Sequence, residues 1–147
     1  MEELVVRKFL DVEASMSDVW DALTNPEKTK KYMFGSEVES DWEVGSPILW
    51  KGVVDGKEVI HLKGVVEEIE PGRMVRYSCF SPASGDEDDP SNYTHVTYEL
   101  SERDGRTLLS VSQGDFSKFT DGEIRFNHTI EAWDAVFLAL QELLEGR

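Results

Sequence analysis

The closing stretch TIEAWDAVFLALQELLEGR (129–147) predicts an amphipathic helix with one strongly apolar face. Large apolar residues recur there at steps of three and four, which places them along one side of a helix with 3.6 residues per turn. This apolar stripe consists of Ile130, Trp133, Phe137, Leu140 and Leu144. Because a contiguous stripe of this size is rarely left open to water, the rest of the chain must supply a surface that covers it.

A capping-box pattern indicates where this helix starts. Thr120 is followed three residues later by Glu123, a spacing at which each side chain can accept a free backbone N–H group of the first turn. We therefore expect a helix from about Thr120 to Leu144, on the order of 36 Å long at 1.5 Å per residue. A helix of that length spans a whole small domain.

The N-terminal part predicts one strand followed by two short helices. The segment LVVRKFLDV (4–12) is rich in β-branched and apolar residues, as strands are. Ser15, with Asp18 three residues later, is typical of a helix N-cap. Asn25 followed by Pro26 repeats the signal for a second helix, because Asn caps helices well and Pro suits the first helical position.

From there to about residue 115 the sequence predicts antiparallel strands joined by tight turns. The turn signals are Asp55-Gly56, Pro71-Gly72 and Asp104-Gly105. Turns this short can join only antiparallel neighbours. Alternation places Val96, Tyr98 and Leu100 on one face of one strand, and Leu109, Val111 and Gln113 on one face of the next.

One loop in this region differs from its surroundings. The segment SPASGDEDDPSN (81–92) combines four acidic residues with two prolines and a glycine, and shows no periodicity. We predict a mobile hairpin tip that folding does not require, since no apolar residue larger than Ala anchors it. A calcium loop is the alternative, but the spacing of an EF-hand and its final bidentate Glu are absent.

The charge balance limits the partners. The chain has 30 acidic and 15 basic side chains and a formal net charge of -15. A nucleic-acid backbone or an anionic membrane would repel it, so we expect neither as a partner. Cys79 is the only cysteine, which excludes an internal disulfide. The N-terminus lacks the pattern of a signal peptide, so a cytoplasmic location is the default expectation.

Several segments together resemble a known family. VWDALTNPEKTKKYM, GVVEEIEPGRMVRYS, VTYEL with GRTLLSVSQGDF, and AWDAVFLALQELLE fall in the order of the family named for the activator of the heat-shock-protein-90 ATPase. This family is part of the START and Bet v 1-like superfamily. The resemblance covers nearly the whole chain and implies an α+β helix-grip fold over a single domain, residues 1–147. In that fold a curved antiparallel sheet wraps around a long C-terminal helix, with two short helices after the first strand.

The resemblance also implies a cavity between the sheet and the long helix, in which superfamily members hold apolar or aromatic small molecules. The aromatic content of the chain is compatible with such a site. The candidate ligand-binding residues are Trp42, Trp50, Tyr77, Tyr98, Gln113, Phe126, Trp133 and Phe137. The alternative is that these side chains simply fill a close-packed core.

Signs of catalytic or metal chemistry are weak. The sequence contains no G-x-S-x-G elbow and no Gly-rich phosphate loop. His61 and His95 alternate away from apolar neighbours, so we expect both to face solvent, and His128 lies two positions off the helix stripe. We therefore assign no catalytic residue, and we expect no cofactor and no bound metal.

Three functions remain open. A small-molecule binding module ranks first. An interaction module that stimulates a heat-shock chaperone ATPase ranks second, because the chaperone activators that resemble this chain carry a further N-terminal domain, whereas this sequence begins with the first predicted strand. A cofactor-free enzyme similar to polyketide cyclases or dehydratases ranks third, with Tyr98 and Gln113 as possible polar groups. We expect a monomer or a weak dimer.

Overall fold

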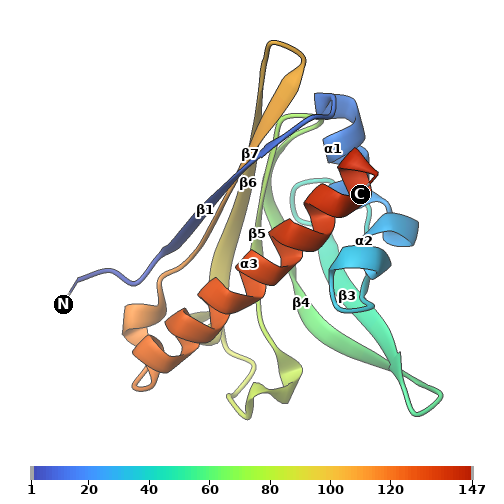
Figure 1. Cartoon of the computed structure of the whole chain (residues 1–147). Helices are drawn as coiled ribbons and strands as arrows, with labels where there is room; N and C mark the ends of the chain where they lie inside the picture. Colours follow the sequence, from blue (N-terminus) through green and yellow to red (C-terminus); the bar gives the residue numbers. More distant parts are fainter. Residues whose placement is uncertain (1, 147) are drawn as a thin grey trace.

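The computed structural model describes residues 2–146, and within them seven strands form one antiparallel sheet (Figure 1). The strands are β1 (Val6–Val12), β2 (Glu37–Ser40), β3 (Pro47–Val54), β4 (Lys57–Glu70), β5 (Met74–Cys79), β6 (Thr94–Arg103) and β7 (Arg106–Gly114). Their order across the sheet is β1-β7-β6-β5-β4-β3-β2. All neighbouring pairs except β1 and β7 are therefore consecutive in the sequence, as short turns require.

Two short helices follow β1, as the capping signals predict. In α1 (Met16–Thr24) the Ser15 side chain accepts a hydrogen bond from the Asp18 backbone N–H. In α2 (Pro26–Tyr32) the Asn25 side chain accepts one from the Glu27 N–H. The Tyr32 hydroxyl then donates to the Ala22 carbonyl at 2.7 Å, which fixes the second helix against the first.

The predicted hairpins form because their turn residues accept a left-handed backbone. Asp55 and Gly56 have φ angles of 53° and 76°, and Asp104 and Gly105 have φ angles of 52° and 77°. Positive φ at both central positions is the geometry that matches the twist of two antiparallel strands. These turns join β3 to β4 and β6 to β7.

The long helix α3 (Gly122–Glu145) begins two residues later than the capping-box pattern predicts. Phe116–Lys118 forms a short 3₁₀ turn, and the Gly122 N–H donates to the Phe119 carbonyl at 3.1 Å. Thr120 is therefore not the N-cap. Asp121 occupies that position, but its carboxylate accepts from Arg125 Nε at 2.7 Å and caps no backbone N–H. The expected extent of the helix, about Thr120 to Leu144, is confirmed to within two residues. The capping role of Thr120 was wrong, because a local motif does not show this preceding turn.

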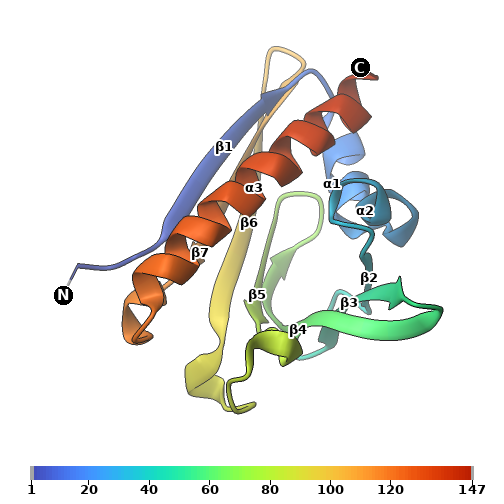
Figure 2. The same ribbon diagram turned by 60° about the horizontal axis from the view of Figure 1, so that its bottom comes forward.

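The sheet curves around α3, which confirms the expected helix-grip architecture. In Figure 1 the helix runs diagonally across one face of the sheet, and Figure 2 shows β2, β3 and β4 bending away from β1 and β7. Trp133, Phe137 and Leu140 are buried on this face, and Ile130 and Leu144 are partly buried beside them. The sheet thus covers the apolar stripe. The inward alternation of β6 and β7 is also confirmed, since Tyr98 and Val111 are buried.

The acidic segment 81–92 is attached to the body of the molecule by charged side chains. It contains two 3₁₀ turns, η1 (Pro82–Ser84) and η2 (Pro90–Asn92). Asp86 pairs with Arg125 of α3, and Asp88 pairs with Lys63 of β4. The Tyr93 hydroxyl also donates to Asp88. The sequence argument considered only apolar anchors and missed these polar ones. The mobility of the segment stays a prediction.

No helix in the part of the chain that the structure describes combines the length and the apolar character needed to cross a membrane.

Candidate functional site

A cavity of about 430 Å³ lies between α3, the inner face of the sheet and the turn after α2. Its deep part is formed by the buried side chains of Trp50, Tyr77, Val96, Trp133 and Val136. These come from β3, β5, β6 and α3, so no single segment of the chain builds the site. The volume falls within the usual range of about 300–1,000 Å³ for small-molecule pockets.

Four of the eight predicted ligand-binding residues line this cavity, namely Trp50, Tyr77, Gln113 and Trp133. The ring centroids of Trp50 and Tyr77 are 6.3 Å apart, with the rings tilted against each other. The Trp133 indole N–H donates to Gln113 Oε1 at 2.9 Å, and Gln113 Nε2 donates to Thr94 Oγ1 at 3.0 Å. This chain of hydrogen bonds holds the deep wall in one arrangement.

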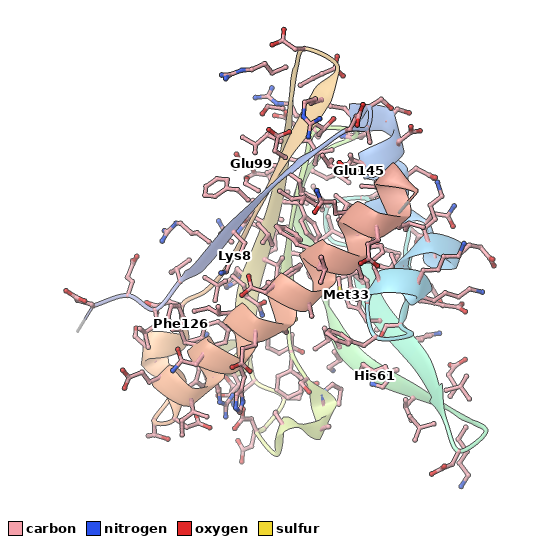
Figure 3. The ribbon with its side chains drawn as sticks, in the orientation of Figure 1. Lys8, Met33, His61, Glu99, Phe126 and Glu145 are labelled. Atoms are coloured by element: carbon pink, nitrogen blue, oxygen red, sulfur yellow. The ribbon has the colours of Figure 1, made fainter. Side chains whose placement is uncertain are left out.

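The structure does not bring the other four predicted residues to the cavity. Tyr98 lies behind the wall, with its ring edge against Trp133 at 5.7 Å between centroids. Phe137 packs against Trp133 from the next helical turn, at 5.9 Å. Phe126 packs on Phe116 near the start of α3, at the end of the helix opposite to Glu145 in Figure 3.

Trp42 is the last of these four. It lies in the connection between β2 and β3, with a φ angle of 56°, and its backbone N–H donates to Ser40 Oγ. Its side chain is partly buried against the core. Trp42, Tyr98, Phe126 and Phe137 therefore fill or flank the core, as the alternative interpretation of the aromatic residues anticipates.

The rim of the cavity contains residues that the sequence did not indicate. Phe34 is 67% exposed and lies in the turn after α2, with a φ angle of 53°. His61 and His128 are exposed and border the cavity from β4 and α3. The prediction that His61 faces solvent is correct as to exposure, but it missed the position of the ring at the cavity.

A β-bulge explains the position of His61. Trp50 pairs with Leu62, but the next residue, Lys51, pairs with Ile60, so His61 is the extra residue of β4. A bulge redirects side chains and breaks the alternation on which the prediction rested. The His61 ring lies over Gly52, where a Cβ atom would overlap Nε2. Glycine at residue 52 therefore makes room for this ring.

The side of α3 that faces the cavity is not the centre of its apolar stripe. The lining residues are His128, Thr129, Ala132, Trp133 and Val136. They follow steps of three and four and share only Trp133 with the stripe. The stripe residues Phe137 and Leu140 are buried in the core instead. The hydrophobic pattern locates the packed side of a helix, whereas the adjoining side borders the cavity.

The ionisable groups in the deep part of the cavity are held neutral. Burial raises the pKa of the Tyr77 phenol well above its ordinary value. Burial likewise raises the pKa of the Cys79 thiol to about 12. None of the described residues that line the cavity is an Asp, Glu, Lys or Arg. In a chain with a net charge of -15, this interior is an uncharged, mainly apolar compartment.

Two buried polar groups near the cavity lack hydrogen-bond partners among the described residues. The first is the Nε1 atom of Trp50, a lining residue, and the second is the hydroxyl of Tyr98. The Tyr98 hydroxyl lies close enough to the Tyr77 hydroxyl for each to affect the pKa of the other, but it makes no hydrogen bond of ordinary geometry. An unsatisfied buried donor costs about 1–3 kcal/mol. A ligand oxygen that reached Trp50 Nε1 after a small shift of the ring would offset this cost.

A second hollow of about 480 Å³ adjoins the first and shares Leu62, Cys79, Gln113, His128 and Thr129 with it. Its far end is charged. Arg125 pairs there with Asp86 at 2.8 Å and with Asp121 at 2.7 Å, and its guanidinium stacks over the Phe119 ring at 4.2 Å. The acidic segment 81–92 thus forms one end of this hollow.

The sequence comparisons agree with the fold. Residues 13–145 match the family described as "Activator of Hsp90 ATPase homolog 1-like protein". The chain belongs to this family. The match spans the segment from the end of β1 to the last turn of α3, so it includes every residue of the cavity. No curated protein is detectably similar to the chain in sequence.

Several solved structures have the same fold. A protein from Cytophaga hutchinsonii, known from its solution structure, is 33% identical and superimposes with a TM-score of 0.80, covering 99% of this chain and 97% of its own. The Aha1 dimer from Colwellia psychrerythraea is 20% identical with a TM-score of 0.72, covering 96% of each chain. CalU16 from Micromonospora echinospora is 20% identical with a TM-score of 0.72, covering 97% of this chain and 74% of its own.

The described residues contain no cluster of metal ligands. Within residues 2–146 no group of three or more His, Cys, Asp and Glu side chains has an arrangement that could hold a metal ion. His95 lies away from the cavity, and its Nδ1 atom is 2.7 Å from Glu67 Oε1. The acidic segment uses Asp86 and Asp88 in ion pairs with Arg125 and Lys63.

Proposed function

We propose that this protein is a small-molecule binding module that holds an apolar or aromatic ligand between α3 and the sheet. The observation that carries the proposal is the uncharged cavity with aromatic walls, lined by Trp50, Tyr77 and Trp133. Membership of a family with the helix-grip fold supports it, because the cavity lies where the sheet wraps the long helix.

Apolar burial would supply most of the affinity. Each Å² of apolar surface removed from water contributes about 25 cal/mol, from which the costs of association are subtracted. The Gln113 side chain is already engaged by Trp133 and Thr94, so it shapes the wall and offers little to a ligand. The Trp50 N–H is the remaining buried donor that would orient a bound oxygen.

A cavity-filling variant with a matched control tests this proposal. Ala132 lines the cavity, whereas Ala135, one turn along the same helix, is exposed. Ala132→Phe should place a ring in the cavity and abolish binding, while Ala135→Phe should leave binding unchanged.

The measurement is a titration of 15N-labelled protein with naphthalene derivatives, flavonoids and lipids, followed by amide chemical shifts. Shifts confined to the lining residues, and lost only in Ala132→Phe, would support binding in the cavity. If no compound shifts these residues in the wild type, or if both variants bind equally well, the binding-module proposal is wrong.

Stimulation of a chaperone ATPase is the second candidate, and the description of the family is the observation that favours it. An ATPase assay with the chaperone from the same host separates the two functions. Stimulation that survives Ala132→Phe would place the activity on an outer surface, and the interaction module would then be the leading function.

A further inference from the structure

The cavity has a polar rim whose chemistry differs from that of its interior. His61 and His128 border it from opposite walls, one on β4 and one on α3. Both side chains are exposed, whereas Trp50, Tyr77 and Trp133 below them are buried. A ligand that fills the cavity would therefore place its apolar body inside and its polar end at the rim, which the two histidines border.

Both imidazoles are available to a ligand. Neither ring makes a hydrogen bond or an ion pair within the described residues, unlike His95, which is paired with Glu67. A neutral imidazole keeps one N–H donor, and a protonated one has two donors and a positive charge. The imidazole N–H groups at the rim are therefore hydrogen-bond donors without an acceptor among the described residues.

The surroundings of the rim favour an anion over a cation. The cavity-lining residues of the described chain include no carboxylate, although the chain has 30 acidic side chains in all. A cationic ligand would find no counter-charge in the cavity itself, and the carboxylates of the adjoining hollow, Asp86 and Asp121, are paired with Arg125. An anionic oxygen would find two N–H donors, and because the rim is exposed, it would keep part of its hydration and lose little by desolvation.

The nearest guanidinium is a weaker candidate for the same role. Arg125 lies in the adjoining hollow, but Asp86 accepts from its Nη1 and Nη2 atoms and Asp121 accepts from its Nε atom. These two carboxylates neutralise the guanidinium and would repel an incoming anion. The free donors on the cavity side are those of the two histidines.

We propose that the ligand is an aromatic acid, with its ring system in the cavity and its carboxylate held at the rim by His61 and His128. This inference rests on the proposed function and specifies the ligand class for the same site. An ionised phenol belongs to the same class, because its oxygen is also an anionic acceptor attached to an aromatic body.

A matched pair of ligands tests the inference. 2-Naphthoate and 2-naphthamide have the same ring system and nearly the same shape, but only the former is charged at pH 7. Calorimetric titration at 0.15 M salt, which limits the reach of the overall negative charge to about 8 Å, measures both affinities. The wild type should bind 2-naphthoate about tenfold more tightly than 2-naphthamide, as expected for hydrogen bonds to a charged group.

The variants locate the effect. The double variant His61→Ala/His128→Ala should lose that tenfold preference and keep its affinity for 2-naphthamide. His61→Gln/His128→Gln, which keeps neutral N–H donors at both positions, should retain more of the preference for 2-naphthoate than the double alanine variant does. His95→Ala, a histidine away from the cavity, should behave like the wild type.

The outcomes separate the two proposals. If 2-naphthamide binds in the cavity but the histidine variants change neither affinity, the histidine rim is wrong and the binding module stands. If Arg125→Gln removes the preference for 2-naphthoate and the histidine variants do not, the anion binds in the adjoining hollow and the inference is overturned. If neither compound binds the wild type, both the inference and an aromatic ligand for the module are wrong.

Discussion

The indole N–H of Trp133 donates a hydrogen bond to Gln113 Oε1 at 2.9 Å, which joins the middle of α3 to β7. Trp133 is 6% exposed, and Gln113 Nε2 in turn donates a hydrogen bond to Thr94 Oγ1 of β6. The same two side chains line the cavity. The contact that fixes the helix on the sheet therefore also shapes the candidate site.

Trp133→Ala should lower the free energy of unfolding by about 3–5 kcal/mol, through lost burial and the cavity left behind. Trp133→Phe keeps most of the ring volume but leaves Gln113 Oε1 without its donor, so a smaller loss of about 1–3 kcal/mol is expected. Chemical denaturation measures both. Leu138→Ala, on the exposed side of α3, is the control, and equal midpoints for all three variants would contradict the assignment of the packed face.

Gly52→Ala should displace the His61 ring without removing it, because the added Cβ atom would overlap Nε2. If His61 binds the carboxylate, this variant should weaken 2-naphthoate and leave 2-naphthamide unchanged, as the histidine variants do. Calorimetry checks the two affinities, and a 1H–15N spectrum checks that the fold is intact. An unchanged affinity for 2-naphthoate, together with a shifted His61 resonance, would argue against a role for this ring.

Gly122→Ala should destabilise the protein, although the helix propensity of alanine exceeds that of glycine by about 1 kcal/mol. The reason is that a Cβ atom at residue 122 would overlap the Phe116 backbone carbonyl, which cannot rotate away as a side chain can. Forced overlap of this kind typically costs about 1–3 kcal/mol. Asn127→Ala, at an exposed position of the same helix, shows the gain from propensity alone. A gain in thermal stability from Gly122→Ala would indicate that α3 and the preceding turn do not pack as described.

The acidic segment 81–92 should detach from α3 at low pH. Pairing with the Arg125 guanidinium lowers the pKa of the Asp86 carboxyl below its ordinary value of 3.8. A lowered pKa in the folded state means that the contribution is fully present above pH 3.8 and is lost as the pH falls through the lower value. The protection of the amides in residues 81–92, measured relative to their intrinsic exchange rate at each pH, should therefore fall as Asp86 is protonated.

The variant Asp86→Asn provides the control for this effect, because it lacks the charge at every pH. The protection of its amides in the segment should already be low at neutral pH, and the wild type should reach the same low protection once Asp86 is protonated. If the wild type and Asp86→Asn show identical exchange in residues 81–92 at pH 7, the ion pair with Arg125 does not hold the segment. The prediction that the segment is mobile would then be supported.

Much of the fold follows from short-range patterns. The caps at Ser15 and Asn25 and the turns at Asp55-Gly56 and Asp104-Gly105 form where the sequence places them, because each depends on a few neighbouring residues. The apolar stripe requires a covering surface. Because the segments before it are strands joined by short turns, an antiparallel sheet is the surface that the sequence predicts. The start of α3 is the exception, since the turn at Phe116–Lys118 displaces it from Thr120 to Gly122.

The sequence by itself thus determined the order of the elements and the covered face of the long helix. Only the tertiary structure decided which side chains border the cavity. Trp50 and Tyr77 meet across the sheet, while Phe137 packs behind Trp133, and a bulge brings His61 to the rim. The reason is physical: periodicity fixes the direction of a side chain within its own element, whereas a cavity depends on how far the sheet curves and how the helix is rotated against it. Both are set by the sum of many long-range contacts, which no local pattern records.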